Sequence, residues 1–512
     1  MQRSSMWARR AMVSTSSPLA VEAALWAWRE GGTAVDAAIA SDAVLGVVQP
    51  FWTGIGGDLF CLVADGDEVV AFNGSGAAPA GLTLAGCQAA AADPGSVPDW
   101  VAGDFPVTLP DTSALAVTVP GVVDGWAQLS ERFGRLPLGT VLEPARRLAA
   151  EGFPVGRVAA WHWQRTGHKL RPGGPLPATV EEGERVANPV LAASLAAIAS
   201  GGPAAHYGGR WAEEAVGAVR AEGGALAEVD LAAHKGEWGT PIAGAYRGYE
   251  VLEHPPNGQG GAVLAALRHL DRDAAPTGAE RLAVLMSAVR EGMRLAHRHV
   301  ADPRTGAVPA FWSDTVYTAA VADGMAVSLI SSVFHLFGSG LTAGGAPLQN
   351  RGLGFSLDPA SPNCAAPGKR PFHTIIPALV RRDGRVWAAL GVVGGPMQPQ
   401  GHVQVLNRLI DEGDDPQAAL DAPRARWLGG DVVALEAGAG GEAGEAVTGG
   451  ARGGAGGGRE AATAALREAG FTVLDGQLHS AEFGSGQVVR VHGDGWLEGG
   501  ADSRRDGAAF GG

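Results

Sequence analysis

The chain has 512 residues, 46% hydrophobic and 18% charged, so it can bury a large interior and lacks the composition of a disordered protein. Its net charge is −14 and it has no cluster of basic residues, which argues against nucleic-acid binding. The three cysteines show no CxxC spacing and favour neither a disulfide framework nor a thiolate zinc site. Without an apolar signal region or a run of about 18 apolar residues, we expect a cytoplasmic protein with no membrane span.

Helical periodicity dominates the first two-thirds of the chain. The first helix is predicted to begin at Pro18 and end at Gly31–Gly32, and the second to cover Ala34 to Val47. The second is apolar on most sides, as expected of a helix buried between neighbours. Residues 59–73 then alternate like a hairpin that turns near Asp65–Gly66. Further helices are predicted over residues 142–151, 189–200 and 281–299.

From residue 315 onward the pattern becomes that of strands. Residues 315–332 predict a hairpin that turns at Asp323–Gly324, and residues 378–390 predict another that turns at Asp383–Gly384. A helix is predicted over residues 401–412, and the Gly/Ala-rich stretch 438–458 is predicted to be a flexible loop. Strands and helices in this proportion indicate a layered fold.

Common short catalytic motifs are missing from the sequence. There is no G-x-S-x-G elbow, no phosphate-binding P-loop and no HExxH pair. The string GIGGD at residues 54–58 is a poor dinucleotide loop, because it precedes a strand and lacks the third spaced glycine. His297 and His299 are two residues apart on a predicted helix and point to different faces, so we expect no metal site there.

A series of longer blocks carries the functional signal. The blocks span residues 12–63, 119–126, 143–155, 254–261, 314–328, 337–341, 348–359, 366–380, 391–406, 419–424 and 501–509. In this order, over nearly the whole chain, they resemble the γ-glutamyltransferase family of N-terminal-nucleophile hydrolases. The resemblance implies an α/β (α+β) fold, a four-layer αββα sandwich formed by a precursor that cleaves itself.

The resemblance places the cleavage between Asp314 and Thr315 and makes Thr315 the nucleophile. Residues 1–314 would form a helix-rich large subunit and residues 315–512 the small subunit of a heterodimer, and a dimer of heterodimers stays open. A free α-amine beside the threonine hydroxyl would act as its general base. Counting back from the Asp323–Gly324 turn would place Asp314 at the nucleophile instead, but the string DTVY favours Thr315.

Three further residues match catalytic positions of the family. Gly394 and Gly395 match paired glycines whose backbone N–H groups form the oxyanion hole, although a plain strand-to-helix turn would also explain them. Ser332 matches a residue that orients the nucleophile, or it is a serine that only packs.

The substrate pocket departs from the family pattern. Ser75 stands where the family has an arginine for the α-carboxylate, and Gly354 where it has an aspartate for the α-amine. His373 and Thr374 replace two serines, and Arg351 replaces a glutamine. Because each charge of an α-amino acid needs a fixed partner, we expect glutathione to be a poor substrate. Arg351 and His373 either receive a carboxylate from another direction or hold loops.

The leading hypothesis is therefore an amide hydrolase or acyltransferase that acts on a small molecule such as oxamate, without a metal or organic cofactor. The resemblance leaves three alternatives. These are a carbon–carbon bond hydrolase of alkylproline-type antibiotic biosynthesis, a true γ-glutamyltransferase, and an unprocessed scaffold without catalytic activity.

Overall fold

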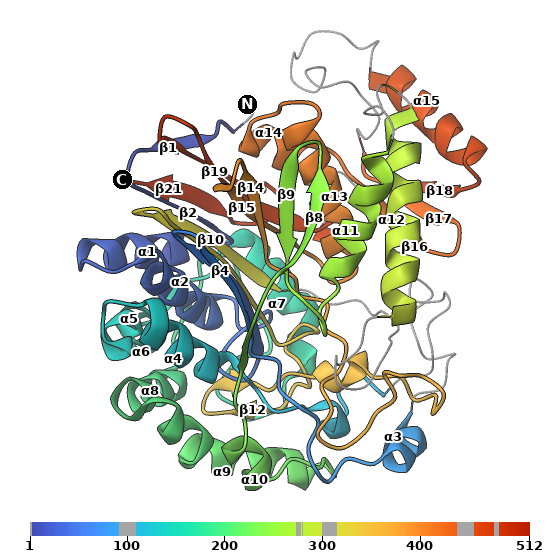
Figure 1. The fold of residues 1–512 in the computed structure, drawn as a ribbon. Coiled ribbons are helices and arrows are strands. Elements are labelled where there is room, and N and C mark those ends of the chain that lie inside the picture. Colours follow the sequence, from blue (N-terminus) through green and yellow to red (C-terminus); the bar gives the residue numbers. More distant parts are fainter. Residues whose placement is uncertain are drawn as a thin grey trace.

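The computed structural model describes residues 3–91, 109–272, 278, 280–299, 315–437, 455–475 and 481–512. Two seven-stranded sheets face each other, and helices cover their outer faces (Figure 1). This is the predicted αββα sandwich. Asp314 and residues 438–454 of the predicted Gly/Ala loop lie outside the described residues, and α15 (Ala455–Glu468) takes up the last four residues of that loop.

The first sheet carries the start of the predicted small subunit at its centre. Its strand order is β21 (Ala508–Gly511), β2 (Ala11–Thr15), β10 (Val316–Ala322), β11 (Met325–Ser332), β3 (Asp58–Asp65), β4 (Glu68–Asn73) and β7 (Glu237–Gly239). All neighbours are antiparallel. The β10–β11 hairpin turns at Asp323 and Gly324, whose φ angles of 50° and 85° suit the mirror-image turn predicted from the sequence.

The second sheet is also antiparallel throughout. Its order is β1 (Met6–Ala8), β20 (Leu497–Ala501), β19 (Ser485–Val491), β15 (Arg385–Val393), β14 (Ala378–Arg382), β9 (Tyr249–Glu253) and β8 (Ile242–Tyr246). The predicted β14–β15 hairpin turns at Asp383 and Gly384, which again have positive φ angles.

The two sheets separate three buried apolar layers, and helices cover the outer two. On the first sheet, α1 (Pro18–Arg29) and α2 (Ala34–Val48) lie close to their predicted bounds. Every residue of α2 is buried, and a Thr33–Asp36 capping box starts it. On the second sheet, α11 (Gly260–Leu270), α12 (Glu280–His299) and α13 (Met397–Ile410) pack together.

Some helix bounds differ from the prediction. α8 (Pro189–Tyr207) continues past residue 200. It is kinked at Gly202, whose backbone angles are not helical, and the helix resumes after Pro203. α13 begins four residues earlier than predicted. Among the described helices, none combines the length and apolarity that crossing a bilayer requires. The cytoplasmic location stays a prediction.

The layer between the sheets determines which side chains can meet. Tyr317, Ile330 and Phe60 of the first sheet pack there against strands of the second. Val316 lies on the opposite face, against the helices. Because side chains alternate along a strand, residues 315, 332 and 58 share the inner face.

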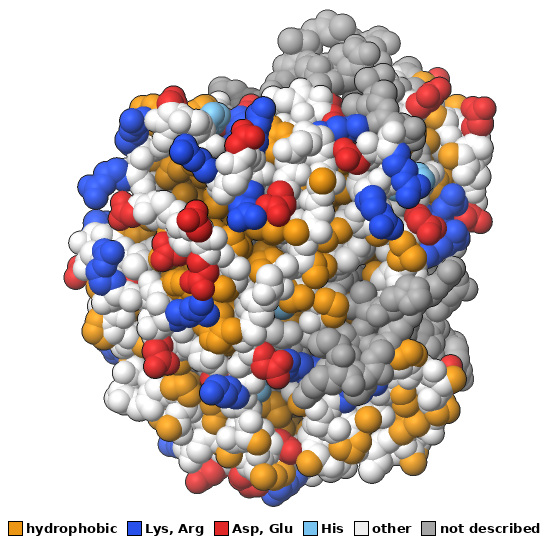
Figure 2. All heavy atoms as spheres, in the orientation of Figure 1, with side chains coloured by type: hydrophobic (Ala, Val, Ile, Leu, Met, Phe, Trp, Pro, Cys, Tyr) orange, Lys and Arg blue, Asp and Glu red, His pale blue; other side chains and the backbone are white. Residues whose placement is uncertain are grey.

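Charged side chains are spread over the surface. On the face that Figure 2 shows, basic and acidic side chains are interspersed and no large basic field appears.

Candidate active site

Three polar residues form a row across the centre of the first sheet. Val316 pairs with Ser331, so antiparallel register places Thr315 opposite Ser332. Ser332 in turn pairs with Asp58 on the next strand. All three side chains are fully buried on the inner face. Two of the predicted residues, Thr315 and Ser332, are thus neighbours.

Thr315 is held at both its hydroxyl and its carbonyl. Its Oγ1 donates to the carbonyl of Ser331 at 2.6 Å, and its own carbonyl accepts from Arg505 at 2.7 Å. Directly before β10, the residue is fixed by the strand that follows. Such fixation is what a nucleophile requires to meet a carbonyl carbon in a defined geometry.

Ser332 has a local role as well. Its Oγ accepts the backbone N–H of Phe334 at 2.7 Å, which shapes the chain as it leaves β11. The hydroxyl therefore supports the loop that carries Phe334, beside the nucleophile.

Asp58 collects hydrogen bonds from three directions. Its Oδ1 accepts from Gln349 Nε2 at 3.0 Å and from the Gly76 N–H at 3.2 Å, while Oδ2 lies 3.1 Å from His373 Nε2. Burial raises the pKa of Asp58 to about 7, and the nearby Arg351 opposes this rise. The carboxyl is therefore poised between its two protonation states at neutral pH.

His373 is a neutral donor in this arrangement. Burial, and secondly the charge of Arg351, hold the pKa of His373 well below its usual range. Its Nδ1 accepts the Ile375 N–H at 3.4 Å, which assigns the proton to Nε2 and directs it toward Asp58. The sequence suggested His373 as a partner for a substrate carboxylate, but in the structure its N–H donates to Asp58.

Arg351 is a buried cation with hydrogen-bonding capacity to spare. One terminal nitrogen donates to Thr374 Oγ1 at 3.2 Å, and the guanidinium lies 4.2 Å from the ring centroid of Phe334. Among the described residues, its Nε and its other terminal nitrogen have no hydrogen-bond partner. Burial lowers the pKa of Arg351 to about 9, against the opposing charge of Asp58, so it is still charged at neutral pH. These donors suit an anion.

The paired glycines adjoin the same site. Gly394 and Gly395 connect β15 to α13 with φ angles of 118° and 60°, a backbone that side-chain-bearing residues rarely adopt. Gln259 links them to the residues around Arg351, because its Nε2 donates to the carbonyl of Gly395 at 2.9 Å and to that of Thr374 at 2.6 Å.

Neither Ser75 nor Gly354 can do what the family's arginine and aspartate do at these positions. Ser75 accepts a hydrogen bond from Asn257 Nδ2 at 3.2 Å and offers no positive charge. A Cβ added at Gly354 would lie 2.6 Å from the carbonyl oxygen of Phe372, so an aspartate would not fit without a backbone shift. The structure therefore has no room for the usual α-amine partner.

Sequence reasoning missed several residues of the site. Asp58 ends the GIGGD string, which we weighed as a dinucleotide loop and which lies in the resembling block of residues 12–63. In the structure Asp58 faces His373 between the sheets. Asn257, Gln259 and Arg505 lie within two of the resembling blocks, and that membership was the available signal.

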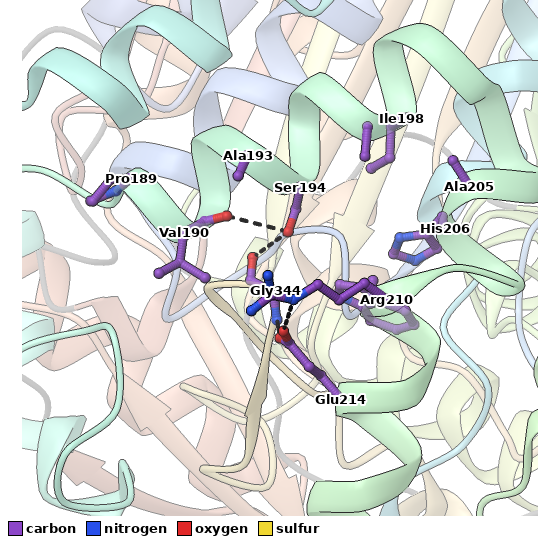
Figure 3. A pocket seen from close by; sticks show the side chains of 12 residues that line it. Pro189, Val190, Ala193, Ser194, Ile198, Ala205, His206, Arg210, Glu214 and Gly344 are labelled. Atoms are coloured by element: carbon purple, nitrogen blue, oxygen red, sulfur yellow. Dashed lines mark hydrogen bonds and ion pairs between the residues drawn. The ribbon is translucent and has the colours of Figure 1, made fainter.

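A hollow of about 370 Å³ lies apart from this site, between α8 and α9 (Arg210–Ala221), and no predicted site residue lines it (Figure 3). There the N–H of Gly344 donates to Glu214 at 2.9 Å, and Ser194 donates to the carbonyl of Gly344 at 2.9 Å. These bonds attach residues of the predicted small subunit to helices of the large one.

Comparison with known proteins places these features in context. The family model described as Gamma-glutamyltranspeptidase matches residues 20–319 and 312–512. The chain is 34% identical to a glutathione hydrolase-like YwrD proenzyme of Bacillus subtilis, over 94% of each chain. It is 32% identical to an oxamate amidohydrolase proenzyme of Klebsiella pneumoniae, over 96% of this chain and 97% of the other.

Among solved structures, a cephalosporin acylase from Bacillus halodurans superposes with a TM-score of 0.87 at 33% identity, covering 100% of this chain and 97% of the other.

Proposed function

The chain belongs to the gamma-glutamyltranspeptidase family and is an enzyme, and from this we propose that it cleaves itself before Thr315 and then hydrolyses a small amide. We further propose that the acyl part of this amide carries a carboxylate and is not γ-glutamyl. The observation that carries the proposal is the row of Thr315, Ser332 and Asp58, with the buried donors of Arg351 beside it.

In the intact chain the nitrogen of Thr315 cannot accept the proton of the hydroxyl. The nitrogen of Thr315 belongs to a peptide bond, and the hydroxyl is buried and bonded to a backbone carbonyl. Cleavage converts that nitrogen into an amine with a free electron pair, which can accept the hydroxyl proton. Cleavage therefore creates the catalyst, and the proenzyme names of two relatives support this step.

In the reaction, Oγ1 of Thr315 attacks the amide carbon while the α-amine takes the hydroxyl proton. The tetrahedral oxyanion is stabilised by the N–H groups of Gly394 and Gly395. The carbon–nitrogen bond then breaks and the leaving amine receives the proton from the α-ammonium. Water attacks the resulting ester and releases the acid, or an amine attacks and the acyl group is transferred.

The pocket supports an acyl carboxylate without an α-amine. Arg351 offers an anion two donor nitrogens that no described residue bonds, whereas Gly354 leaves an α-ammonium without its carboxylate. Oxamate, after which one relative is named, bears a carboxylate next to its amide. That relative supports the proposed substrate class.

The cleavage is tested by intact-mass spectrometry of the purified protein. Two fragments that divide between residues 314 and 315 are expected, and Thr315→Ala should give one uncut chain without activity. Thr318→Ala, the same change three residues along β10, is the matched control and should be cut. An active uncut protein, or a second fragment that begins elsewhere, would refute the proposal.

The substrate class is tested with three p-nitroanilides. Valeryl, glutaryl and γ-glutamyl differ stepwise by a carboxylate and then an α-amine, and glutaryl should have the highest kcat/KM. Arg351→Gln should lower kcat/KM for the glutaryl substrate by roughly 10–100-fold, because this substrate loses a charged hydrogen bond. The kcat/KM for the valeryl substrate, which has no carboxylate, should stay nearly unchanged. Arg381→Gln, in the partly exposed pair with Glu250, is the control. Preferred turnover of γ-glutamyl would overturn the argument.

A further inference from the structure

A buried arginine contacts the nucleophile from a segment near the C-terminus. Arg505 lies in the turn between β20 and β21 and is 2% exposed. One terminal nitrogen donates to the carbonyl oxygen of Thr315 at 2.7 Å. The guanidinium lies 3.6 Å from the ring centroid of Trp52, which is itself buried. Both contacts fix a positive charge against the backbone of Thr315.

The neighbouring residues make this placement rigid. Arg504 donates to Glu436 and to Asp502, at 2.8 Å and 3.0 Å, and these groups are fully buried. The Arg505 N–H also reaches the carbonyl of Asp502 at 3.4 Å. The turn that carries Arg505 is therefore anchored independently of Thr315.

We infer that Arg505 is a positioning residue that keeps the α-amine of mature Thr315 uncharged near neutral pH, an inference that rests on the proposed cleavage. The amine lies two bonds from the carbonyl that Arg505 holds, so the two charges would be within about 6 Å of each other. A like charge disfavours the ammonium form, and only the uncharged amine can accept the hydroxyl proton.

Among the described residues, the other ionisable groups around Thr315 do not replace this effect. On the inner face, Asp58 lies beside the opposite charge of Arg351, and His373 is neutral. Behind β11, Asp42 bonds Ser331 from the helix side of the sheet. It favours the ammonium but lies on the other face of the strand.

The charge of Arg505 also acts on a histidine near Trp52. His162 of α7 (Arg157–Thr166) lies 4.8 Å from Trp52 between ring centroids. Burial, and secondly the charge of Arg505, hold the pKa of His162 well below its usual range. His162 is therefore neutral and adds no charge of its own.

The expected size of the effect follows from Coulomb's law. A unit charge about 6 Å away, through an effective dielectric constant of about 20, lowers the pKa of an amine by roughly 1–2 units. An ordinary α-amine has a pKa of about 7.7–8.0. The mature Thr315 amine should thus titrate near pH 6–7, and most of it would be in the basic form at neutral pH.

The first test uses the processed wild-type protein and needs no variant. The rate of α-amine labelling with acetic anhydride is followed against pH by mass spectrometry of the peptide that begins at Thr315. A midpoint below about pH 7 is expected. A midpoint at the ordinary value of about 7.7–8.0 would overturn the inference while leaving the proposed function intact. A small fragment that does not begin at Thr315 would refute both.

Two variants then identify the cause. Arg505→Gln keeps a donor for the Thr315 carbonyl but removes the charge, so the labelling midpoint and the acid limb of kcat/KM should both rise by about 1 unit or more. Arg505→Lys keeps the charge and should shift them by less than about 0.3 units. A purely structural role would lower kcat in both variants without moving either midpoint, and that result would overturn the inference. If Arg505→Gln is not cleaved, the wild-type midpoint still decides.

Discussion

Asp42 offers a sharp test of the electrostatics beneath the nucleophile. This carboxyl is fully buried in α2, where one oxygen accepts from Ser331 Oγ and the other from Trp126 Nε1 at 2.8 Å. Burial raises its pKa from 3.8 to about 6, and the two hydrogen bonds oppose the rise. We predict that the stability of Asp42→Asn relative to the wild type rises by about 3 kcal/mol between pH 4 and pH 8.

The asparagine can keep both hydrogen bonds of Asp42. Its oxygen can face Trp126, and one amide N–H can donate to Ser331, whose hydroxyl is then free to donate to Thr53, 2.6 Å away. The second amide N–H and the Thr53 hydroxyl proton are then left without an acceptor among the described residues, and this cost is the same at every pH. The pH dependence of the difference from the wild type therefore reports the charge alone.

The sign follows from proton linkage. The folded state binds the Asp42 proton more tightly than the unfolded state, so ionisation destabilises the fold as pH rises from about 4 to 6 and not further above it. A rise of about two units corresponds to about 3 kcal/mol. The difference in the free energy of unfolding between Asp42→Asn and the wild type should therefore grow by about 3 kcal/mol from pH 4 to pH 8.

The assay is urea unfolding at pH 4, 6 and 8 in a Thr315→Ala background, so that a single chain unfolds. Asp67→Asn, at the exposed β3–β4 turn, is the control and should stay within about 0.5 kcal/mol at each pH. A difference that does not grow with pH would show that the buried carboxylate is favourably paired and that our reasoning is wrong.

Two further predictions concern positions around the pocket, both measured by urea unfolding. Gly354→Asp should lower the free energy of unfolding by roughly 1–3 kcal/mol and gain no γ-glutamyl activity, because its Cβ would press on the carbonyl of Phe372; a γ-glutamyl-p-nitroanilide assay that finds turnover would contradict this. Arg504→Met should lower the free energy of unfolding by roughly 3–5 kcal/mol, because the buried Glu436 loses its charged partner. A loss below about 1 kcal/mol would mean that water or another cation replaces the arginine.

The sequence alone determined much of this protein. The bounds of α1 and α2 and the two Asp-Gly hairpins follow from local periodicity and turn chemistry, which depend on residues near in sequence. The ordered blocks gave the family, the αββα fold and Thr315 as the expected nucleophile. That role of Thr315 stays a prediction until the cleavage is measured.

Only the tertiary structure decided what surrounds Thr315. The sheet register brings Ser332 and Asp58 beside it, and the packing of two sheets brings His373 onto Asp58 from 315 positions away. It also buries Arg351 with two donor nitrogens that nothing in the described part of the chain bonds, and it sets Arg505 against the nucleophile. No local pattern records these contacts, because register and packing between sheets depend on the burial of all strands together, and that burial fixes both the pKa shifts and the pocket.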